Sequence, residues 1–405
     1  MSVPKLRFKE FDGDWKIKKL GNSFNLISGY AFPSSASVDK GAKWLKIADV
    51  GIQEMTPSSL SYLPHEFLEK YPQFIVSKDD YVIALTRPIL NKKLKIAKVG
   101  SSYDGALLNQ RVAKIQTNEN DLGFIYSLLQ KSKTVEELEN SISGTDPPNL
   151  SLNDVKDIRL GFPSIEEQTK IASFLSTVDE KINQLTQKHQ LLSQYKQGMM
   201  QKLFSQQIRF KADDGSEFGE WKIGKLGDIT SIQGGFAFKS TNFGKGMTKV
   251  IRIGDIEKNI NLDSFTGIYS NEIPDTRYLI SENAIVMALS GATFGKLGKV
   301  NQGYAYINQR VATFKVFEDS LNEFVYQIML SQEFTTYIQS IPSASAQPNI
   351  SNQDVINFEM MIPCLEEQTK IANFLSAIDQ KINVVSGQLE QAKLWKKGLL
   401  QQMFV

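Results

Sequence analysis

A long helical segment occurs twice in this chain, and this duplication limits the possible folds more than any other feature. The stretch IEEQTKIASFLSTVDEKIN begins at Ile165, and LEEQTKIANFLSAIDQKIN begins at Leu365 and aligns with it without gaps. In both copies apolar residues recur at alternating steps of four and three, the heptad pattern of helices that supercoil around a partner. This apolar seam includes Ile171, Leu175, Val178 and Ile182 in the first copy and Ile371, Leu375, Ile378 and Ile382 in the second.

The most suitable partner for either helix is the other copy, because a seam of this length needs a partner of equal length. We therefore predict two long helices packed as an antiparallel coiled coil with pseudo-twofold symmetry. This arrangement brings Val405 back to the first globular part of the chain. Polar residues on a seam cost stability but fix its register, and His189, Lys196 and Lys396 lie on this seam. The alternative is that each segment is only a core helix of a globular domain.

The start of the first helix carries a capping-box pattern. Ser164 lies three residues before Glu167, so each side chain is placed to accept a hydrogen bond from the backbone of the other. In the second copy Cys364 occupies the cap position, and we expect a weaker cap there.

The globular parts are duplicated as well. The stretch LLNQRVAKI (107–115) returns as YINQRVATF (306–314), for example. Short apolar runs separated by Gly, Ser, Asn and Pro predict strands, and a shorter helix follows them in each copy. We predict two α+β modules, each with a mixed or antiparallel sheet and helices, over residues 14–163 (module 1) and 220–363 (module 2).

Composition excludes several protein classes. With one cysteine, Cys364, and two histidines, His65 and His189, the chain forms no internal disulfide, and we expect no metal site of the Cys/His type. We find no apolar run long enough to span a bilayer and no signal-peptide stretch, so we expect a cytoplasmic protein without membrane contact. Because the net charge is only +2, any surface that binds nucleic acid must be local.

The helix length suggests what two such modules can bind. A helix of about 39 residues is roughly 58 Å long, and an antiparallel pair would hold one module at each end. B-DNA presents equivalent major-groove faces about 34 Å apart. The two helices would then act as a spacer between modules that read two half-sites, with unread base pairs between them. Modules with the same scaffold but different loops can read different half-sites.

These features resemble the specificity subunit of type I restriction-modification systems. The resemblance covers the whole chain and is most specific at PSIEEQTKIASFL (163–175) and PCLEEQTKIANFL (363–375). The string IRIGDI of the second module is replaced by LKIADV in the first, a small departure. The family implies the following division: target recognition domain 1 (1–163), helical spacer 1 (164–206), target recognition domain 2 (207–363) and helical spacer 2 (364–405).

The resemblance also implies partners. The chain would recognise a bipartite, asymmetric site in double-stranded DNA, and its helical seams would serve as spacer and docking platform. Two modification subunits would carry S-adenosylmethionine and methylate adenine, and restriction subunits would use ATP with Mg²⁺. No cofactor is then expected in this chain, which would be no enzyme by itself. The alternatives are a stand-alone or fused DNA adenine methyltransferase and a coiled-coil scaffold for other proteins.

One motif bears on the methyltransferase alternative. Asp146-Pro147-Pro148-Asn149 resembles the tetrapeptide of amino-methyltransferases, Asp/Asn-Pro-Pro-aromatic, but ends in Asn instead of an aromatic residue. The aligned second copy, residues 346–349, has lost the motif. We therefore favour a proline-stiffened loop over a catalytic site.

Candidate DNA contacts come from basic and repeated loops. The first module has a basic stretch without acidic residues between Arg87 and Lys98, and its counterpart between residues 290 and 299 is rich in glycine. Cations and exposed backbone suit phosphate contact, although a basic surface is often merely solvated. The arginines of the two Asn-Gln-Arg triplets suit base reading, but their identity in both modules favours a scaffold or phosphate role. The candidates are Arg87, Lys92, Lys93, Lys95, Lys98, Arg111, Lys239, Arg252, Lys296, Lys299 and Arg310.

Overall fold

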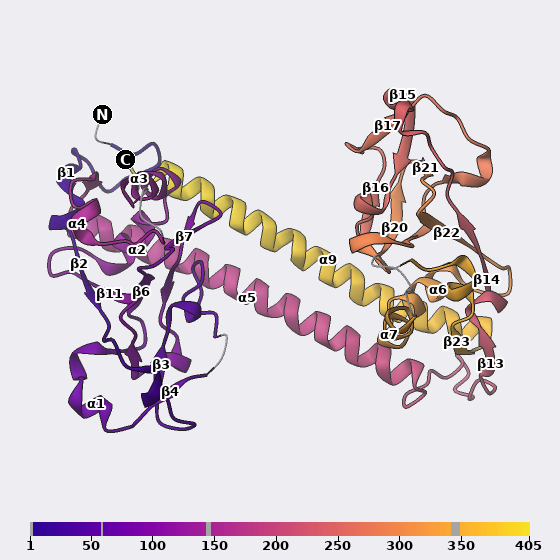
Figure 1. Ribbon diagram of the computed structural model, residues 1–405, viewed down its shortest axis with the longest axis horizontal. Helices are drawn as coiled ribbons and strands as arrows, with labels where there is room; N and C mark the ends of the chain where they lie inside the picture. The colour runs from indigo at the N-terminus through magenta and orange to yellow at the C-terminus, as the bar shows by residue number, and fades with distance from the viewer. Residues whose placement is uncertain (1–2, 58–59, 143–146, 342–348) are drawn as a thin grey trace. The chain divides into compact units, whose positions relative to one another are not determined.

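The computed structural model describes residues 3–57, 60–142, 147–341 and 349–405. The chain divides into two compact units: unit 1 comprises Met1–Thr186 and Gly387–Val405, and unit 2 comprises Gln187–Ser386. Both long helices form as single elements, α5 (Ile165–Phe204) and α9 (Leu365–Gln402) (Figure 1). Each unit therefore contains one module together with one part of each long helix.

Module 1 has two four-stranded sheets. The first sheet has the order β2-β11-β6-β9 and is antiparallel throughout. The second has the order β4-β3-β10-β5, in which β3 and β10 are parallel. The sequence predicted a mixed or antiparallel sheet, and module 1 contains one sheet of each kind. The strands of the first sheet are β2 (Asn25–Ser28), β11 (Val112–Gln116), β6 (Tyr81–Ala84) and β9 (Ile96–Lys98). Those of the second are β4 (Tyr62–Leu63), β3 (Ala42–Leu45), β10 (Ala106–Leu108) and β5 (Ile75–Val76).

Smaller elements complete unit 1. Strand β1 (Lys16–Lys19) pairs antiparallel with β12 (Arg159–Phe162), directly before α5. Strands β7 (Ile89–Leu90) and β8 (Lys93–Leu94) form a hairpin of their own between β6 and β9. The short helices are α1 (Phe67–Lys70), α2 (Leu122–Leu128), α3 (Ser132–Ile142) and α4 (Leu152–Val155).

Module 2 repeats the two larger sheets with one added strand and has a short turn in place of the β7–β8 hairpin. Its sheets have the orders β14-β22-β19-β20-β16 and β17-β15-β21-β18, and β13 pairs with β23. Strand β16 lengthens the first sheet and has no counterpart among the described strands of module 1. The strands are β13 (Lys222–Lys225), β14 (Thr230–Gly234), β15 (Phe243–Ile251), β16 (Asn259–Asn261), β17 (Ile268–Ser270), β18 (Leu279–Ile280), β19 (Ile285–Ala288), β20 (Leu297–Gln302), β21 (Ala305–Ile307), β22 (Val311–Val316) and β23 (Glu359–Ile362). The helices are α6 (Asn322–Met329), α7 (Gln332–Ser340) and α8 (Asn352–Ile356).

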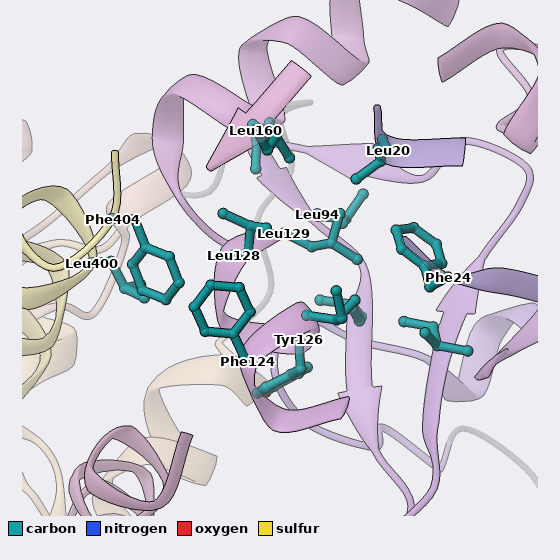
Figure 2. Close-up of a cluster of buried hydrophobic side chains, with 14 of the residues drawn as sticks. Leu20, Phe24, Leu94, Phe124, Tyr126, Leu128, Leu129, Leu160, Leu400 and Phe404 are labelled. Atoms are coloured by element: carbon teal, nitrogen blue, oxygen red, sulfur yellow. The ribbon is translucent and has the colours of Figure 1, made fainter. Parts of the chain in front are cut away.

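The end of α9 is part of the hydrophobic core of unit 1. Leu400 and Phe404 lie beside Phe124 of α2 in this core (Figure 2), and the ring centroids of Phe124 and Phe404 are 5.2 Å apart. The backbone N–H of Leu6 donates to the carbonyl of Gln402 over 2.9 Å. Val405 packs against this module too, beside Gly161. The predicted return of the C-terminus to module 1 is therefore confirmed.

In each unit the first turns of one long helix pack beside the last turns of the other, which is the expected antiparallel pairing. Seven of the eight seam residues named from sequence are buried, and Ile182 is half-buried. They belong to the hydrophobic cores of the two units. Continued to the end of α5, the heptad pattern places Met199 on the seam, and there the prediction is wrong by one residue, because Met200 is buried and Met199 only half-buried. The seven are Ile171, Leu175, Val178, Ile371, Leu375, Ile378 and Ile382.

The predicted capping box is only half present. The N–H of Glu167 approaches the hydroxyl of Ser164 at a long 3.4 Å. The carboxylate of Glu167 does not return to the cap but accepts two hydrogen bonds from Arg7, at 2.8 and 2.7 Å, and a third from the indole of Trp15 at 3.3 Å. A buried carboxylate gains more from a guanidinium than from one backbone N–H, and Arg7 lies within reach.

The second copy explains why the Glu-Glu-Gln sequence recurs. Glu367, fully buried, accepts from Arg209 at 3.1 and 2.7 Å and from Trp221 at 2.8 Å. The next residue, Gln368, accepts from the backbone of Leu321 and donates to the carbonyl of Pro363. Gln168 makes the equivalent bonds in unit 1. The motif thus fastens the start of each long helix to its own module.

Among the described residues, we find no helix with an apolar stretch of the length that a membrane span needs.

Candidate nucleic-acid interface

Three loops meet at one end of β6 in module 1, and we call this place loop junction 1. It consists of Leu85-Thr86-Arg87, Asn109-Gln110-Arg111 and Pro148-Asn149. The N–H of Leu85 donates to the carbonyl of Arg111 at 2.9 Å, and the N–H of Arg87 donates to that of Pro148 at 2.8 Å. The hydroxyl of Thr86 donates to the side-chain oxygen of Asn149 at 2.6 Å. The backbone therefore fixes the three loops relative to one another.

Module 2 has the same arrangement, loop junction 2, built from Leu289-Ser290, Asn308-Gln309-Arg310 and Asn349-Ile350. The N–H of Leu289 donates to the carbonyl of Arg310, and the N–H of Ile350 donates to that of Leu289, each over 2.9 Å. Ser290 and Asn349 form a β-bridge, as Thr86 and Asn149 do in module 1. The two junctions share their backbone framework and most of their residues.

The side chains of the two junctions are used differently. Arg310 donates from Nη1 to the side-chain oxygen of Asn349 over 3.2 Å. In module 1 the corresponding oxygen of Asn149 instead accepts a hydrogen bond from the hydroxyl of Thr86. The guanidinium of Arg111 is exposed and makes no hydrogen bond or ion pair with the residues that the structure describes. Loop junction 1 therefore offers a free cation where loop junction 2 offers a bound one.

The repeated asparagines of the triplets have a structural role. The side chain of Asn109 accepts from the N–H of Arg111 at 3.2 Å, and that of Asn308 accepts from the N–H of Gln309 at 2.8 Å. The chain that follows β2 passes so close to the turn in module 1 that only glycine fits: a Cβ on Gly29 would lie 2.2 Å from the carbonyl oxygen of Leu108. These contacts favour the scaffold interpretation of the asparagines over base reading.

The basic stretch of module 1 separates into two parts. Lys92 and Lys93, at the end of the β7–β8 hairpin, are exposed. Lys95 is half-buried and donates to the carbonyl of Ile47 at 3.2 Å, and its burial lowers the pKa of its ammonium. Lys98 forms an ion pair with Asp79 at 2.8 Å. The sequence did not reveal these partners, which lie outside the stretch.

Most of the cations predicted in module 2 have acidic partners. Arg252 lies 3.2 Å from Asp255, and Lys296 lies 3.2 Å from Glu257. Lys299 lies 2.5 Å from Glu323. Lys239 is exposed, and its backbone N–H donates to Glu272. Of the eleven candidate cations named from sequence, those without an acidic partner within 4 Å among the described residues are Arg87, Lys92, Lys93, Lys95, Arg111, Lys239 and Arg310.

The model for the type I restriction modification DNA specificity domain matches residues 12–193 and again residues 219–394. The chain belongs to this family. Each match begins near the start of a module and extends into the following long helix, so the chain carries two copies of the family's domain. The resemblance inferred from the Glu-Glu-Gln motifs is thereby confirmed.

Individual relatives agree with this family. The chain is 31% identical over 212 residues to the type I restriction enzyme MjaVIII specificity subunit of Methanocaldococcus jannaschii, a match to 52% of this chain and 50% of the relative. It is 24% identical to the putative MjaX specificity subunit of the same organism, over 98% of this chain and 94% of the relative. The MjaVIII match thus spans about half of that protein, whereas the MjaX match spans nearly all of it.

A solved structure supports the fold. The crystal structure of the type I restriction-modification S subunit from M. genitalium matches with a TM-score of 0.66 and 16% identity, covering 100% of this chain and 99% of that one. At this identity the likeness concerns the fold alone.

The methyltransferase-like tetrapeptide cannot be followed completely, because Asp146 lies outside the described residues. Of the remainder, Asn149 stands where the methyltransferase motif has an aromatic ring, and its side chain donates to the carbonyl of Pro147 at 2.9 Å and accepts from Thr86. Sequence reasoning missed Thr86 and Asn149 as members of the junction. The recurrence of Pro-Asn at 148–149 and 348–349 was the available signal.

Proposed function

We propose that this chain is the DNA-reading subunit of a type I restriction-modification complex. Module 1 would read one half of a bipartite, asymmetric site in double-stranded DNA, and module 2 the other half. The observation that carries the proposal is the pair of loop junctions. They share one backbone framework but use their side chains differently: the guanidinium of Arg111 has no partner among the described residues, whereas that of Arg310 donates to Asn349.

The division of labour with other subunits belongs to the same proposal. The chain would make no covalent change to DNA itself, because its methyltransferase-like motif ends in Asn149 and recurs without its first residues in the second copy. Two modification subunits would supply S-adenosylmethionine and methylate adenine. Restriction subunits would supply cleavage driven by ATP and Mg²⁺. The complex would act in the cytoplasm, where its DNA lies.

A selection experiment tests the DNA-reading role. The full-length chain, combined with the modification subunits of its system, is incubated with a pool of random duplexes, and the retained duplexes are sequenced. The proposal expects two short conserved blocks of different sequence, separated by a constant number of unread base pairs. Enrichment of one continuous block, or of no sequence, would contradict it.

A second measurement tests the non-catalytic role. The purified chain alone is mixed with radiolabelled S-adenosylmethionine. We expect no retained label from the chain by itself and retained label once the modification subunit is added. Stoichiometric binding by the chain alone would instead support the alternative of a fused adenine methyltransferase.

A further inference from the structure

We propose that Asn91, at the tip of the β7–β8 hairpin, reads an adenine in the major groove of the half-site bound by module 1. This inference rests on the proposed DNA-reading function and specifies which residue supplies part of it. Asn91 was not among the candidates from sequence, where only the cations around it were considered.

The hairpin is narrow and its turn is tightly defined. Ile89 pairs with Leu94 and Leu90 pairs with Lys93, so only Asn91 and Lys92 form the turn. Both have positive φ, 50° and 57°, as the turns that best connect two twisted strands require. A two-residue turn of this kind holds its tip in one position relative to its strands.

The base of the hairpin is anchored to module 1. Leu94 is buried in the hydrophobic core. The N–H of Lys95 donates to the carbonyl of Pro88 at 2.7 Å, and the N–H of Arg87 donates to that of Pro148 in loop junction 1. The tip is therefore a rigid projection and no loose loop. Figure 1 shows the hairpin at the label β7.

Lys92, the second of the two turn residues, is an unfavourable choice for conformation alone. Glycine adopts positive φ without cost and asparagine does so readily, whereas a lysine side chain strains the backbone there. In the described part of the chain seven non-glycine residues have positive φ, and Arg87, Asn91 and Lys92 are three of them within six positions. Strained residues gather at functional sites, where the side chain is needed despite its conformational cost. The strained Arg87 and Lys92 therefore point to a functional role for this hairpin, and Asn91 lies beside Lys92 at its tip.

The exposed surface of the tip has the chemistry of a groove reader. Leu90, Asn91, Lys92 and Lys93 are exposed, and the segment from Arg87 to Lys98 contains no acidic residue. The amide of Asn91 makes no hydrogen bond with any residue described. The major groove accommodates a two-stranded ribbon, and an Asn side chain matches the N6 and N7 positions of adenine with two hydrogen bonds. Lys92 and Lys93, one position further on, suit the flanking phosphates.

Module 2 has no counterpart of this hairpin. The connection between β19 and β20 contains a short 3₁₀ turn, Gly291–Thr293, in place of two strands. The reading assigned to Asn91 is therefore specific to one half-site. A change at Asn91 must leave the other half-site unaffected.

The test uses Asn91→Gly, which retains the turn and removes the amide. Its matched control is Asn283→Gly, the same replacement at another exposed asparagine with positive φ, 68°, in module 2. Both proteins are combined with the modification subunits and used to select duplexes from a random pool. We expect Asn91→Gly to lose discrimination at one adenine of one half-site by at least tenfold, and Asn283→Gly to select the wild-type sequence. Thermal unfolding should show that neither variant is less stable than the wild type.

The other outcomes are also decisive. If Asn91→Gly selects the same two half-sites as the wild type, the inference is wrong. Loss of discrimination at a position other than adenine overturns the assigned base. If the wild-type complex itself selects no half-sites, the proposed function fails, which is a different result from failure of this inference. The variant Lys92→Gly should weaken binding to all duplexes to a similar extent, since a phosphate contact carries no sequence information.

Discussion

Lys196 of α5 and Asp379 of α9 form an ion pair in unit 2, with 2.6 Å between Nζ and Oδ2. Lys396 of α9 and Asp179 of α5 form the reciprocal pair in unit 1 at 2.5 Å. Both lysines are buried on the apolar seam. Two of the three polar residues on the seam, Lys196 and Lys396, are thus paired with carboxylates of the facing helix. A paired charge on a seam favours one register and one orientation, because any shift leaves it unpaired.

Each of these pairs also contacts its module. The ammonium of Lys396 donates to the side-chain oxygens of Gln53 and Gln130, each over 3.0 Å. In unit 2, Asp379 accepts from Lys258 and Gln327, each over 2.9 Å. In each unit, therefore, one buried ion pair links the two long helices to each other and to the module of that unit.

Removing the ammonium of Lys396 should destabilise unit 1. Lys396→Met retains the apolar stem but leaves Asp179, Gln53 and Gln130 without their donor, and we expect the free energy of unfolding to fall by about 3 kcal/mol. Urea denaturation followed by circular dichroism measures this loss. The matched control is Lys397→Met, whose lysine is exposed on the same helix turn. Equal stabilities of the two variants would contradict the role given to the buried pair.

The pair in unit 2 predicts a dependence of stability on pH. Burial alone would raise the pKa of Asp379, but the charge of Lys196 and hydrogen bonds from Lys196, Gln327 and Lys258 outweigh it and lower this pKa below 3.8. A carboxyl with a lowered pKa in the folded state stabilises that state above its unfolded pKa and loses this contribution as the pH falls. The difference in unfolding free energy between wild type and Asp379→Asn should be constant above about pH 5 and shrink below about pH 4. A constant difference down to about pH 2 would be inconsistent with this assignment.

The two adjacent glutamates of the first helix should respond differently to substitution. Glu167→Gln removes the buried charge that binds Arg7 and Trp15, and we expect a loss of about 2 to 3 kcal/mol. Glu166 is exposed, so Glu166→Gln should cost no more than about 1 kcal/mol, its contribution from the helix dipole. Thermal or urea unfolding of both variants provides the comparison. If both variants lose similar amounts of stability, the Glu-Glu-Gln motif does not stabilise the protein through Glu167.

The difference between the loop junctions predicts unequal effects of two arginines on DNA binding. Arg111→Ala should lower the affinity for duplex DNA and reduce the slope of log affinity against log salt by about one unit. Arg310→Ala should change this slope less, because Asn349 already holds its guanidinium. Fluorescence anisotropy at several salt concentrations measures both. Equal slopes for the two variants would count against the distinction.

The sequence predicted the long helices and the duplicated modules well, because periodicity and repetition are local properties of a chain. The start of each helix at Ile165 and Leu365 and the buried positions of Leu175 and Leu375 follow from the heptad pattern. The prediction of a buried Met199 was wrong because the end of α5 packs into the core of module 2, where Met200 is buried instead.

The candidate site was harder to predict, because charge pairing depends on residues far apart in sequence. Lys299 is paired with Glu323, and Lys98 with Asp79, so neither is the free cation that the basic stretches suggested. Thr86 and Asn149 could be assigned to loop junction 1 only once the structure showed that their loops lie side by side. The positive φ of Lys92 was equally hidden, since no residue preference would place lysine there.

The central claim is that two modules each read a half-site and that the long helices set the gap between them. Its most direct test inserts one heptad after Thr186 in α5 and one after Ser386 in α9, so that the seams still match. Seven residues add about 10 Å of helix, or about three base pairs of DNA. Sequencing of methylated sites in a host carrying the complete altered system should show both half-sites unchanged and the gap longer by about three base pairs. An unchanged gap in an active complex would contradict the account.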